Sequence, residues 1–188
     1  DQGQVLELHP GVPANPGQGN TTLERALPEG SQILDPLAGG GDKATFYFRY
    51  ARPIVEGVPA QSDTTWGLSA GSTDARNAET GQLSYGSYSV LGRTEIDGII
   101  DIRNGGDYID LVLAALETNT WYEFWFVIDH GANTFSQYIK GGTDFPEQTA
   151  LTPADAAYRF ATFAALGTIL LITTTGNETN RKGVDPVY

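Results

Sequence analysis

The chain of 188 residues contains no cysteine and no methionine. The lack of cysteine excludes disulfides, but a domain of this length can fold without them, because it buries roughly 70% of the surface that its unfolded chain exposes. Cysteine usage therefore gives no indication of the compartment. Because residue 1 is Asp rather than Met, we expect its amino terminus to come from processing or trimming of a longer chain.

Basic residues are scarce: 11 Lys and Arg stand against 23 Asp and Glu, a formal net charge of −12. The electrostatic field of this negative charge repels nucleic acid and anionic membranes, so we expect no nucleic-acid partner. Long apolar runs are also absent. The longest candidate, residues 164–172, is interrupted by Gly167 and falls short of the ~18 residues that a transmembrane helix needs. We expect no membrane span.

The residues that are present indicate a packed β-protein. Apolar residues make up 40% of the chain, aromatic residues 11% and charged residues only 18%, which is the balance of a folded domain. The chain also has 23 glycines and an acidic bias, a composition typical of extracellular bacterial β-proteins. We therefore expect a secreted or cell-surface localisation.

Strand patterns recur along the whole chain, separated by clusters of Gly, Asn, Asp and Pro. The predicted strands are residues 4–9, 45–50, 64–70, 83–90, 95–103, 108–113, 121–129, 134–140, 158–162 and 168–175. Ten short strands with no domain boundary between them predict a single all-β domain over residues 1–188, built as a two-sheet antiparallel sandwich. One short helix of about two turns is predicted near residues 153–158, because Thr152-Pro153 is a typical helix start.

Two motifs carry a resemblance to a known family. The segment WYEFWFVID at residues 121–129 is followed by a tight turn and by NTFSQYIKGG at residues 133–142. This pair resembles the central hairpin of laminin-G-like domains of the concanavalin A-like lectin and glucanase superfamily. The resemblance implies a jelly roll of two curved sheets, and it implies fold far better than function, because that superfamily holds lectins, binding modules, hydrolases and lyases.

Alternation along the strands predicts a binding surface. Phe124, Phe126 and Ile128 form an apolar face, which leaves Trp125 on the opposite face of the same strand. Aromatic rings beside planar polar groups suit sugars, whose C–H faces stack on the rings. If the polar faces share the concave sheet, the ligand-binding residues are Tyr47, Arg49, Trp66, Arg103, Glu123, Trp125 and Gln137.

One segment also resembles a catalytic motif. The segment EIDGIID at residues 95–101 is similar to the Glu-x-Asp-x-x-Glu strand of laminarinases and agarases on this fold. Along an extended strand, however, Glu95 and Asp101 would lie about 20 Å apart, whereas a retaining glycosidase needs its carboxyl groups roughly 5–5.5 Å apart. We therefore predict no catalytic residue.

Members of the superfamily often hold one structural calcium ion, so calcium is the one cofactor that we consider. Asp35, Asp42 and Asp185 are oxygen donors of the right type in Gly-rich or terminal loops, but their spacing defines no site. The end of the chain, GVDPVY at residues 183–188, resembles domains in which a further strand follows. We expect a neighbouring domain or a strand-donating chain to occupy that sheet edge.

These observations predict a non-catalytic carbohydrate-binding or adhesion domain that recognises a polysaccharide or glycoconjugate on its concave sheet. Two alternatives stay open. One is a polysaccharide-degrading enzyme, either a glycoside hydrolase or a lyase, on the same fold. The other is a structural subunit of a cell-surface assembly.

Overall fold

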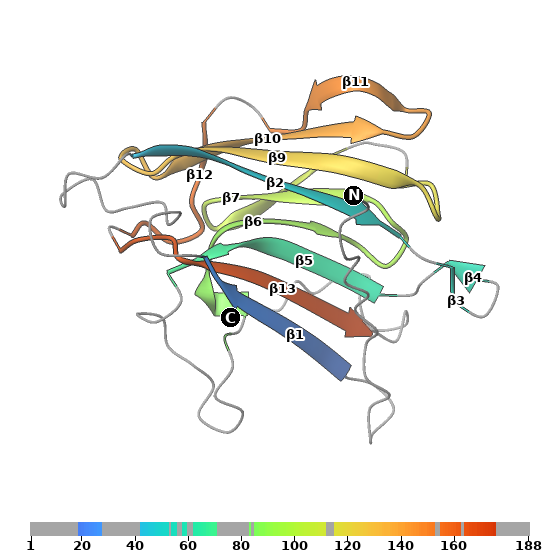
Figure 1. Ribbon diagram of the computed structural model, residues 1–188, viewed down its shortest axis with the longest axis horizontal. Coiled ribbons are helices and arrows are strands. Elements are labelled where there is room, and N and C mark those ends of the chain that lie inside the picture. The colour runs from blue at the N-terminus through green and yellow to red at the C-terminus, as the bar shows by residue number, and fades with distance from the viewer. Residues whose placement is uncertain are drawn as a thin grey trace.

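The computed structural model describes residues 19–27, 42–52, 54–55, 58–59, 62–70, 83, 85–111, 115–152, 155–162 and 164–175. These residues form an all-β sandwich of two antiparallel sheets, as the sequence predicted (Figure 1). The one helical element among them is the 3₁₀ turn η3 (Tyr85–Ser87). In this part of the chain, no helix has the length and apolarity to cross a bilayer.

A six-stranded sheet forms one layer. In spatial order its strands are β1 (Gly19–Ala26), β13 (Thr168–Thr175), β5 (Ser62–Ser69), β6 (Tyr88–Thr94), β7 (Ile100–Asn104) and β8 (Asp107–Asp110). The first and last strands of the described chain, β1 and β13, pair over their whole length. A separate hairpin, β3 (Ile54–Val55) and β4 (Val58–Pro59), lies outside both layers.

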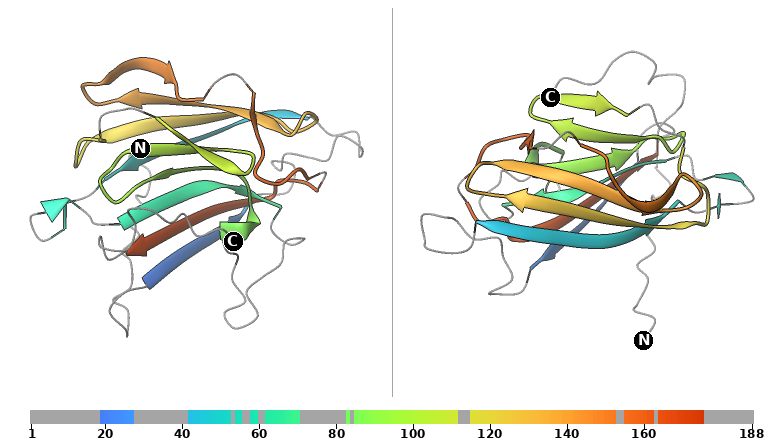
Figure 2. Two further views of the ribbon diagram at one scale, coloured as in Figure 1. Left: turned by 180° about the vertical axis from the view of Figure 1, so that it is seen from behind. Right: turned by 90° about the horizontal axis from the view of Figure 1, so that it is seen from above.

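The second layer is a five-stranded sheet (Figure 2). Its order is β11 (Phe145–Ala150), β10 (Thr134–Gly141), β9 (Trp121–Asp129) and β2 (Lys43–Ala51), and β12 (Ala156–Ala157) also pairs with β10. The predicted hairpin of β9 and β10 is confirmed. Its turn is closed by the Ala132 amide, which donates to Asp129 Oδ1 at 3.1 Å, and by Asn133 with a φ of 55°.

Aromatic side chains fill the space between the sheets. Phe124, Phe126 and Ile128 of β9 are buried, as the alternation predicted. The Phe48 and Phe124 rings stack with centroids 5.2 Å apart, and Trp66 of β5 packs against Phe124 at 5.0 Å. These large buried rings therefore fix which face of each strand points into the core.

The six-stranded sheet is covered on its other face as well. Tyr88, Leu91 and Leu170 point away from the inter-sheet core, yet each is fully buried in a second apolar cluster with Leu83 and Ile172. The five-stranded sheet differs, because its outer face keeps large side chains in solvent. Among the described residues, the outer face of the five-stranded sheet is thus the more open of the two outer faces.

Several predicted elements were wrong. The strand predicted over 95–103 is broken by a turn, since Gly98 N donates to the Glu95 carbonyl and Glu95 N to the Ile99 carbonyl. The helix predicted near 153–158 is not formed over 155–158: Ala156 and Ala157 pair with β10 instead. The predicted strand over 158–162 is irregular, whereas β1 and β11 were not predicted. The predicted strand 4–9 lies outside the described residues.

Candidate functional site

The exposed face of the five-stranded sheet carries a row of three aromatic residues. Tyr47 of β2 is paired with Trp125 of β9, and Trp125 is paired with Tyr138 of β10. Directly paired residues point to the same face of a sheet, so the three rings follow one another across neighbouring strands, which are about 4.8 Å apart. We call Tyr47, Trp125 and Tyr138 the aromatic row.

Tyr47 and Trp125 form the centre of the row. Their ring centroids are 5.5 Å apart and their planes are inclined by 45°. Tyr47 remains 46% exposed, and its hydroxyl donates to Glu123 Oε1 at 3.3 Å. Desolvation and the Glu123 carboxylate raise the pKa of Tyr47, so its hydroxyl stays a hydrogen-bond donor at neutral pH.

Charged groups flank the row toward one end of the strands. Arg49 and Glu123 are paired in the next register position. The Arg49 guanidinium lies over the Trp121 ring, 5.1 Å from its centroid, so one face of this indole is already occupied. Trp121 is 43% exposed but lies two register positions from the row. Trp125, which is half-buried, is the indole that packs beside Tyr47.

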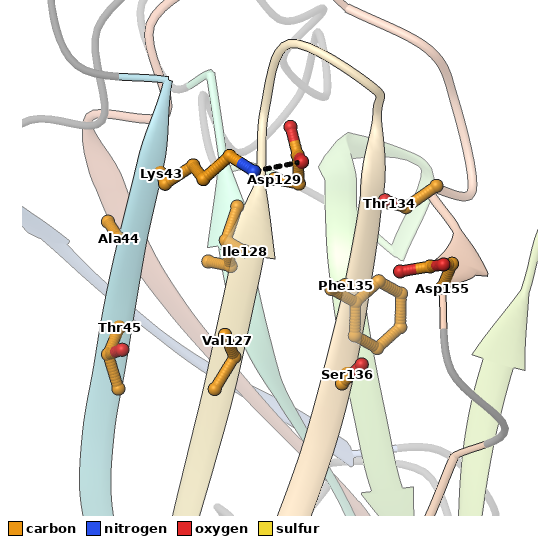
Figure 3. Close-up of a pocket in the computed structure, with 10 residues that line it drawn as sticks. All are labelled: Lys43, Ala44, Thr45, Val127, Ile128, Asp129, Thr134, Phe135, Ser136 and Asp155. Atoms are coloured by element: carbon orange, nitrogen blue, oxygen red, sulfur yellow. Dashed lines mark ion pairs between the residues drawn. The ribbon is translucent and has the colours of Figure 1, made fainter.

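A hollow of about 380 Å³ continues the row at the other end of the strands (Figure 3). Its floor is the next register position, where Thr45, Val127 and Ser136 are paired across three strands. Val127 is 44% exposed between the two hydroxyl-bearing residues. The walls are Lys43 and Asp129 on one side, and Thr134 and Asp155 on the other. We call this feature the hollow.

An ion pair closes one wall of the hollow. Lys43 Nζ lies 3.0 Å from Asp129 Oδ2, as the dashed line in Figure 3 marks. The hydrogen bond and charge of Asp129 raise the pKa of Lys43, and the bonds from Lys43 and the Ala132 amide lower the pKa of Asp129. Both groups are therefore charged at neutral pH. The pair is solvated, so it contributes little to stability.

The opposite wall is held in place from the other sheet. Asp155, with a φ of 64°, directly precedes β12. The Ala157 amide of β12 donates to Asn104 Oδ1 at 2.8 Å, and the Gly105 amide donates back to the Ala157 carbonyl at 3.0 Å. The β7–β8 turn of the six-stranded sheet thus fixes the segment that carries Asp155.

Four of the seven predicted binding residues share this open face: Tyr47, Arg49, Glu123 and Trp125. Trp66 and Gln137 do not line it, because both are fully buried on the inner faces of the sheets. Arg103 belongs to the other layer, where it donates to the carbonyls of Gly105 and Gly106. The single groove of seven residues that the sequence suggested is therefore not formed, and the binding role of the four gathered residues stays a prediction.

Tyr138 was missed for an identifiable reason. The inner face of β10 consists of Phe135, Gln137 and Ile139. Because Gln137 is polar, its residue type suggested an outward side chain. The pairing of Gln137 with the buried Phe126 settles its face. Counting from the aromatic Phe135 and the apolar Ile139 would have placed Tyr138 outside.

The acidic segment 95–101 forms a compact cluster rather than an extended strand. Arg93 Nη2 lies 2.9 Å from Glu95 Oε1 and 2.8 Å from Asp101 Oδ2, so the turn brings the two carboxylates together. The separation of about 20 Å expected for an extended strand was wrong. Partial burial, the charge of Asp101 and a hydrogen bond with Asp101 raise the pKa of Glu95 to about 7, against the opposing charge of Arg93.

Within the described ranges, no group of three or more His, Cys, Asp or Glu side chains is arranged to hold a metal ion. Asp35 and Asp185, two of the three calcium candidates, lie outside these ranges. The third, Asp42, lies against the β9–β10 turn, where its backbone carbonyl accepts from the His130 amide at 2.6 Å.

Comparison with known proteins gives distant structural likeness and no sequence match. No protein-family model matches the chain, and no curated protein matches it. Among solved structures, it is similar to a GH131 beta-glucanase catalytic domain from Podospora anserina, with 13% sequence identity and a TM-score of 0.38 over 85% of this chain and 69% of that one. A likeness at this TM-score does not establish a shared function.

Proposed function

We propose that this chain is a carbohydrate-binding domain that holds a polysaccharide on the open face of its five-stranded sheet. The aromatic row is the observation that carries the proposal. Three aromatic residues follow one another across β2, β9 and β10 on the outer face of the five-stranded sheet, where described residues such as Tyr47 and Val127 are exposed. Tyr47 is exposed and the other two residues are half-buried, and sugar rings that stack on such rings remove their remaining surface from water.

The flanking groups suit the hydroxyls of a sugar chain. Glu123 accepts hydrogen bonds beside the row. The Tyr47 hydroxyl, which bonds to Glu123, can both donate and accept. The rings of Tyr47 and Trp125 are inclined by 45°, so they do not form one flat plane. Inclined rings fit a single, twisted glycan chain better than the flat surface of a crystalline polymer. Such a ligand is extracellular, in keeping with the composition.

A pair of tryptophans in β9 gives a matched test. Trp125 belongs to the row and Trp121 does not, although both are on the same face of the same strand. Isothermal titration against soluble glucans, mannans, xylans and chitin-derived oligomers should detect binding to at least one class. Trp125→Ala should weaken that binding by about tenfold or more, which corresponds to ~1.4 kcal/mol, and Trp121→Ala should leave it unchanged.

Two results would contradict the proposal. One is the absence of binding to every glycan class in a folded wild-type protein. The other is an equal loss for the two tryptophan variants with unchanged melting temperatures, since the row would then have no special part in the interaction.

The second candidate function is glycoside hydrolysis at Glu95 and Asp101. The observation in its favour is the pKa of Glu95, which at about 7 is that of a group able to donate a proton at neutral pH. Against it, the Asp101 side chain is only 4% exposed, and a carboxyl pair that shares a hydrogen bond is closer than the roughly 5 Å that a glycosidase uses. Release of reducing ends by the wild type, lost in Glu95→Gln, would favour the enzyme.

A further inference from the structure

We propose that the hollow is a subsite of the same surface, which takes one sugar unit of the bound glycan and selects an amino sugar by its ammonium group. The inference rests on the proposed function, because the sugar reaches the hollow as part of a chain held on the aromatic row. The hollow and the row occupy consecutive register positions on β2, β9 and β10. A chain that leaves the row toward Val127 therefore enters the hollow directly.

The size and floor of the hollow fit one sugar unit. Its volume of about 380 Å³ exceeds what a single sugar ring needs. Val127 offers an exposed apolar patch at the centre of the floor, and the hydroxyls of Thr45 and Ser136 stand on either side of it. A pyranose ring has the same division, with apolar C–H groups on its face and hydroxyls at its rim.

The charges around the hollow are unbalanced. Lys43 is paired with Asp129, and the same lysine is also attracted by the charges of Asp42 and Asp155. The Asp155 carboxylate itself makes no ion pair or hydrogen bond with any part of the chain that the structure describes. The wall therefore has an excess of negative charge, which a cationic ligand group would neutralise.

An ammonium group matches this wall in its hydrogen bonds. It has three donors and no acceptor, and the groups that line the hollow include the Asp155 carboxylate and the hydroxyls of Thr134 and Ser136 (Figure 3). A charge-assisted bond of this kind is roughly twice as strong as a neutral one. A uronate would be repelled by Asp155 instead. Asp155 is therefore the specificity-determining residue of the hollow.

The test compares oligomers that differ at the C2 nitrogen, which is a charged ammonium in one and an uncharged acetamide in the other. Glucosamine hexamer and N-acetylglucosamine hexamer are titrated into the whole 188-residue chain by calorimetry. We expect the wild type to bind the glucosamine hexamer at least about tenfold more tightly, with a preference that weakens in salt. Asp155→Asn, which keeps the shape of the side chain, should abolish the preference. Glu147→Gln, which removes an exposed acid from β11 of the same sheet, should retain it.

The outcomes separate this inference from the proposed function. Equal affinity for the two hexamers, tighter binding of the N-acetylated one, or a preference that survives Asp155→Asn would overturn the amino-sugar subsite. In each of these cases, if the wild type binds glycan and Trp125→Ala does not, the proposed binding to the aromatic row would still be supported. Binding of neither hexamer nor of any other glycan would overturn both proposals. Unchanged melting temperatures of the variants confirm that each measurement is made on folded protein.

Discussion

Tyr47 and Trp125 are neighbours on the outer face of β2 and β9, with their ring centroids 5.5 Å apart. On the inner side of the same two strands, Phe46 stacks on Phe126 at 6.2 Å and Phe48 on Phe124 at 5.2 Å. A shift of one residue in either strand would exchange the two faces. The buried rings therefore determine which rings are exposed.

Most of the contribution of Tyr47 to glycan affinity should come from its ring and not from its hydroxyl. Tyr47→Ala removes the stacking surface beside Trp125 and should weaken binding by about tenfold. Tyr47→Phe loses only the 3.3 Å bond to Glu123 and should retain most of the affinity. Calorimetric titration of both variants measures the difference. Loss of binding in Tyr47→Phe would instead identify the hydroxyl as the main contact.

Truncation of a core ring should destabilise the whole sandwich. Phe126 is fully buried and packs against Phe46, Phe48 and Phe135. Phe126→Ala should lower the free energy of unfolding by about 3–5 kcal/mol, as large-to-small changes in cores do. Urea unfolding followed by tryptophan fluorescence measures this change. Val127→Ala, at the next residue but on the open face, should change it by less than about 1 kcal/mol.

Gln137 should be replaceable by an apolar residue with a gain in stability. Its side chain is fully buried, and neither atom of its amide group has a hydrogen-bond partner. Gln137→Leu keeps a similar volume and removes the cost of the unsatisfied amide, so we expect a gain of about 1 kcal/mol in the free energy of unfolding. A lower urea midpoint in the variant would indicate that an internal water molecule satisfies the amide.

The β6–β7 turn should depend on glycine at position 98. Gly98 has a φ of +92°, and a Cβ there would lie 2.5 Å from Arg52 Nη1. Arg52 cannot easily move away, because it donates to the carbonyls of Ile96 and Asp97 at 2.6 and 2.8 Å. Gly98→Ala should cost about 1–3 kcal/mol in thermal or urea unfolding.

A second glycine serves as the control for this turn. Gly106, in the turn after β7, has no heavy atom within 4 Å of a Cβ built on it. Gly106→Ala should therefore be close to neutral. If both variants lost the same stability, the contact with Arg52 and the positive φ would not be the cause.

Stability should fall as the pH rises through the range in which Glu95 ionises. The pKa of Glu95 is raised from 4.5 to about 7 in the folded chain, so the folded state holds this proton more tightly than the unfolded state. The contribution is present below pH 4.5, decreases between pH 4.5 and about 7, and is lost above. In Glu95→Gln the melting temperature should depend less on pH over this range. If the melting temperature changed equally with pH in the wild type and the variant, Glu95 would be excluded as the source of the pH dependence.

The fold was predictable where alternation and turn chemistry agree. In β9 the apolar set Phe124, Phe126 and Ile128 fixes both faces, and the turn at Asp129–Asn133 fixes the hairpin. Prediction failed where two local signals compete. Thr152-Pro153 resembles a helix start, but the edge of β10 is open to pairing and takes up Ala156 and Ala157.

The site was predictable only in part, because it combines strands that are distant in sequence. Alternation placed Trp125 and Glu123 outside, yet it could not show that β5 and β7 belong to the other sheet, which removes Trp66 and Arg103 from the surface. Nor could it show the turn at Gly98, since the isoleucines at positions 96, 100 and 102 continue a strand pattern through it. Secretion and a bound calcium ion stay predictions.

The two hydrogen bonds between Ala157 and the Asn104-Gly105 turn have a consequence for how recognition could change in evolution. They fix the position of Asp155 from a loop of the opposite sheet, which lies outside the lining of the hollow. A substitution in that loop would move the wall without altering any side chain that lines the hollow. Related chains can thus acquire new preferences through a loop on the other layer while the aromatic row stays the same.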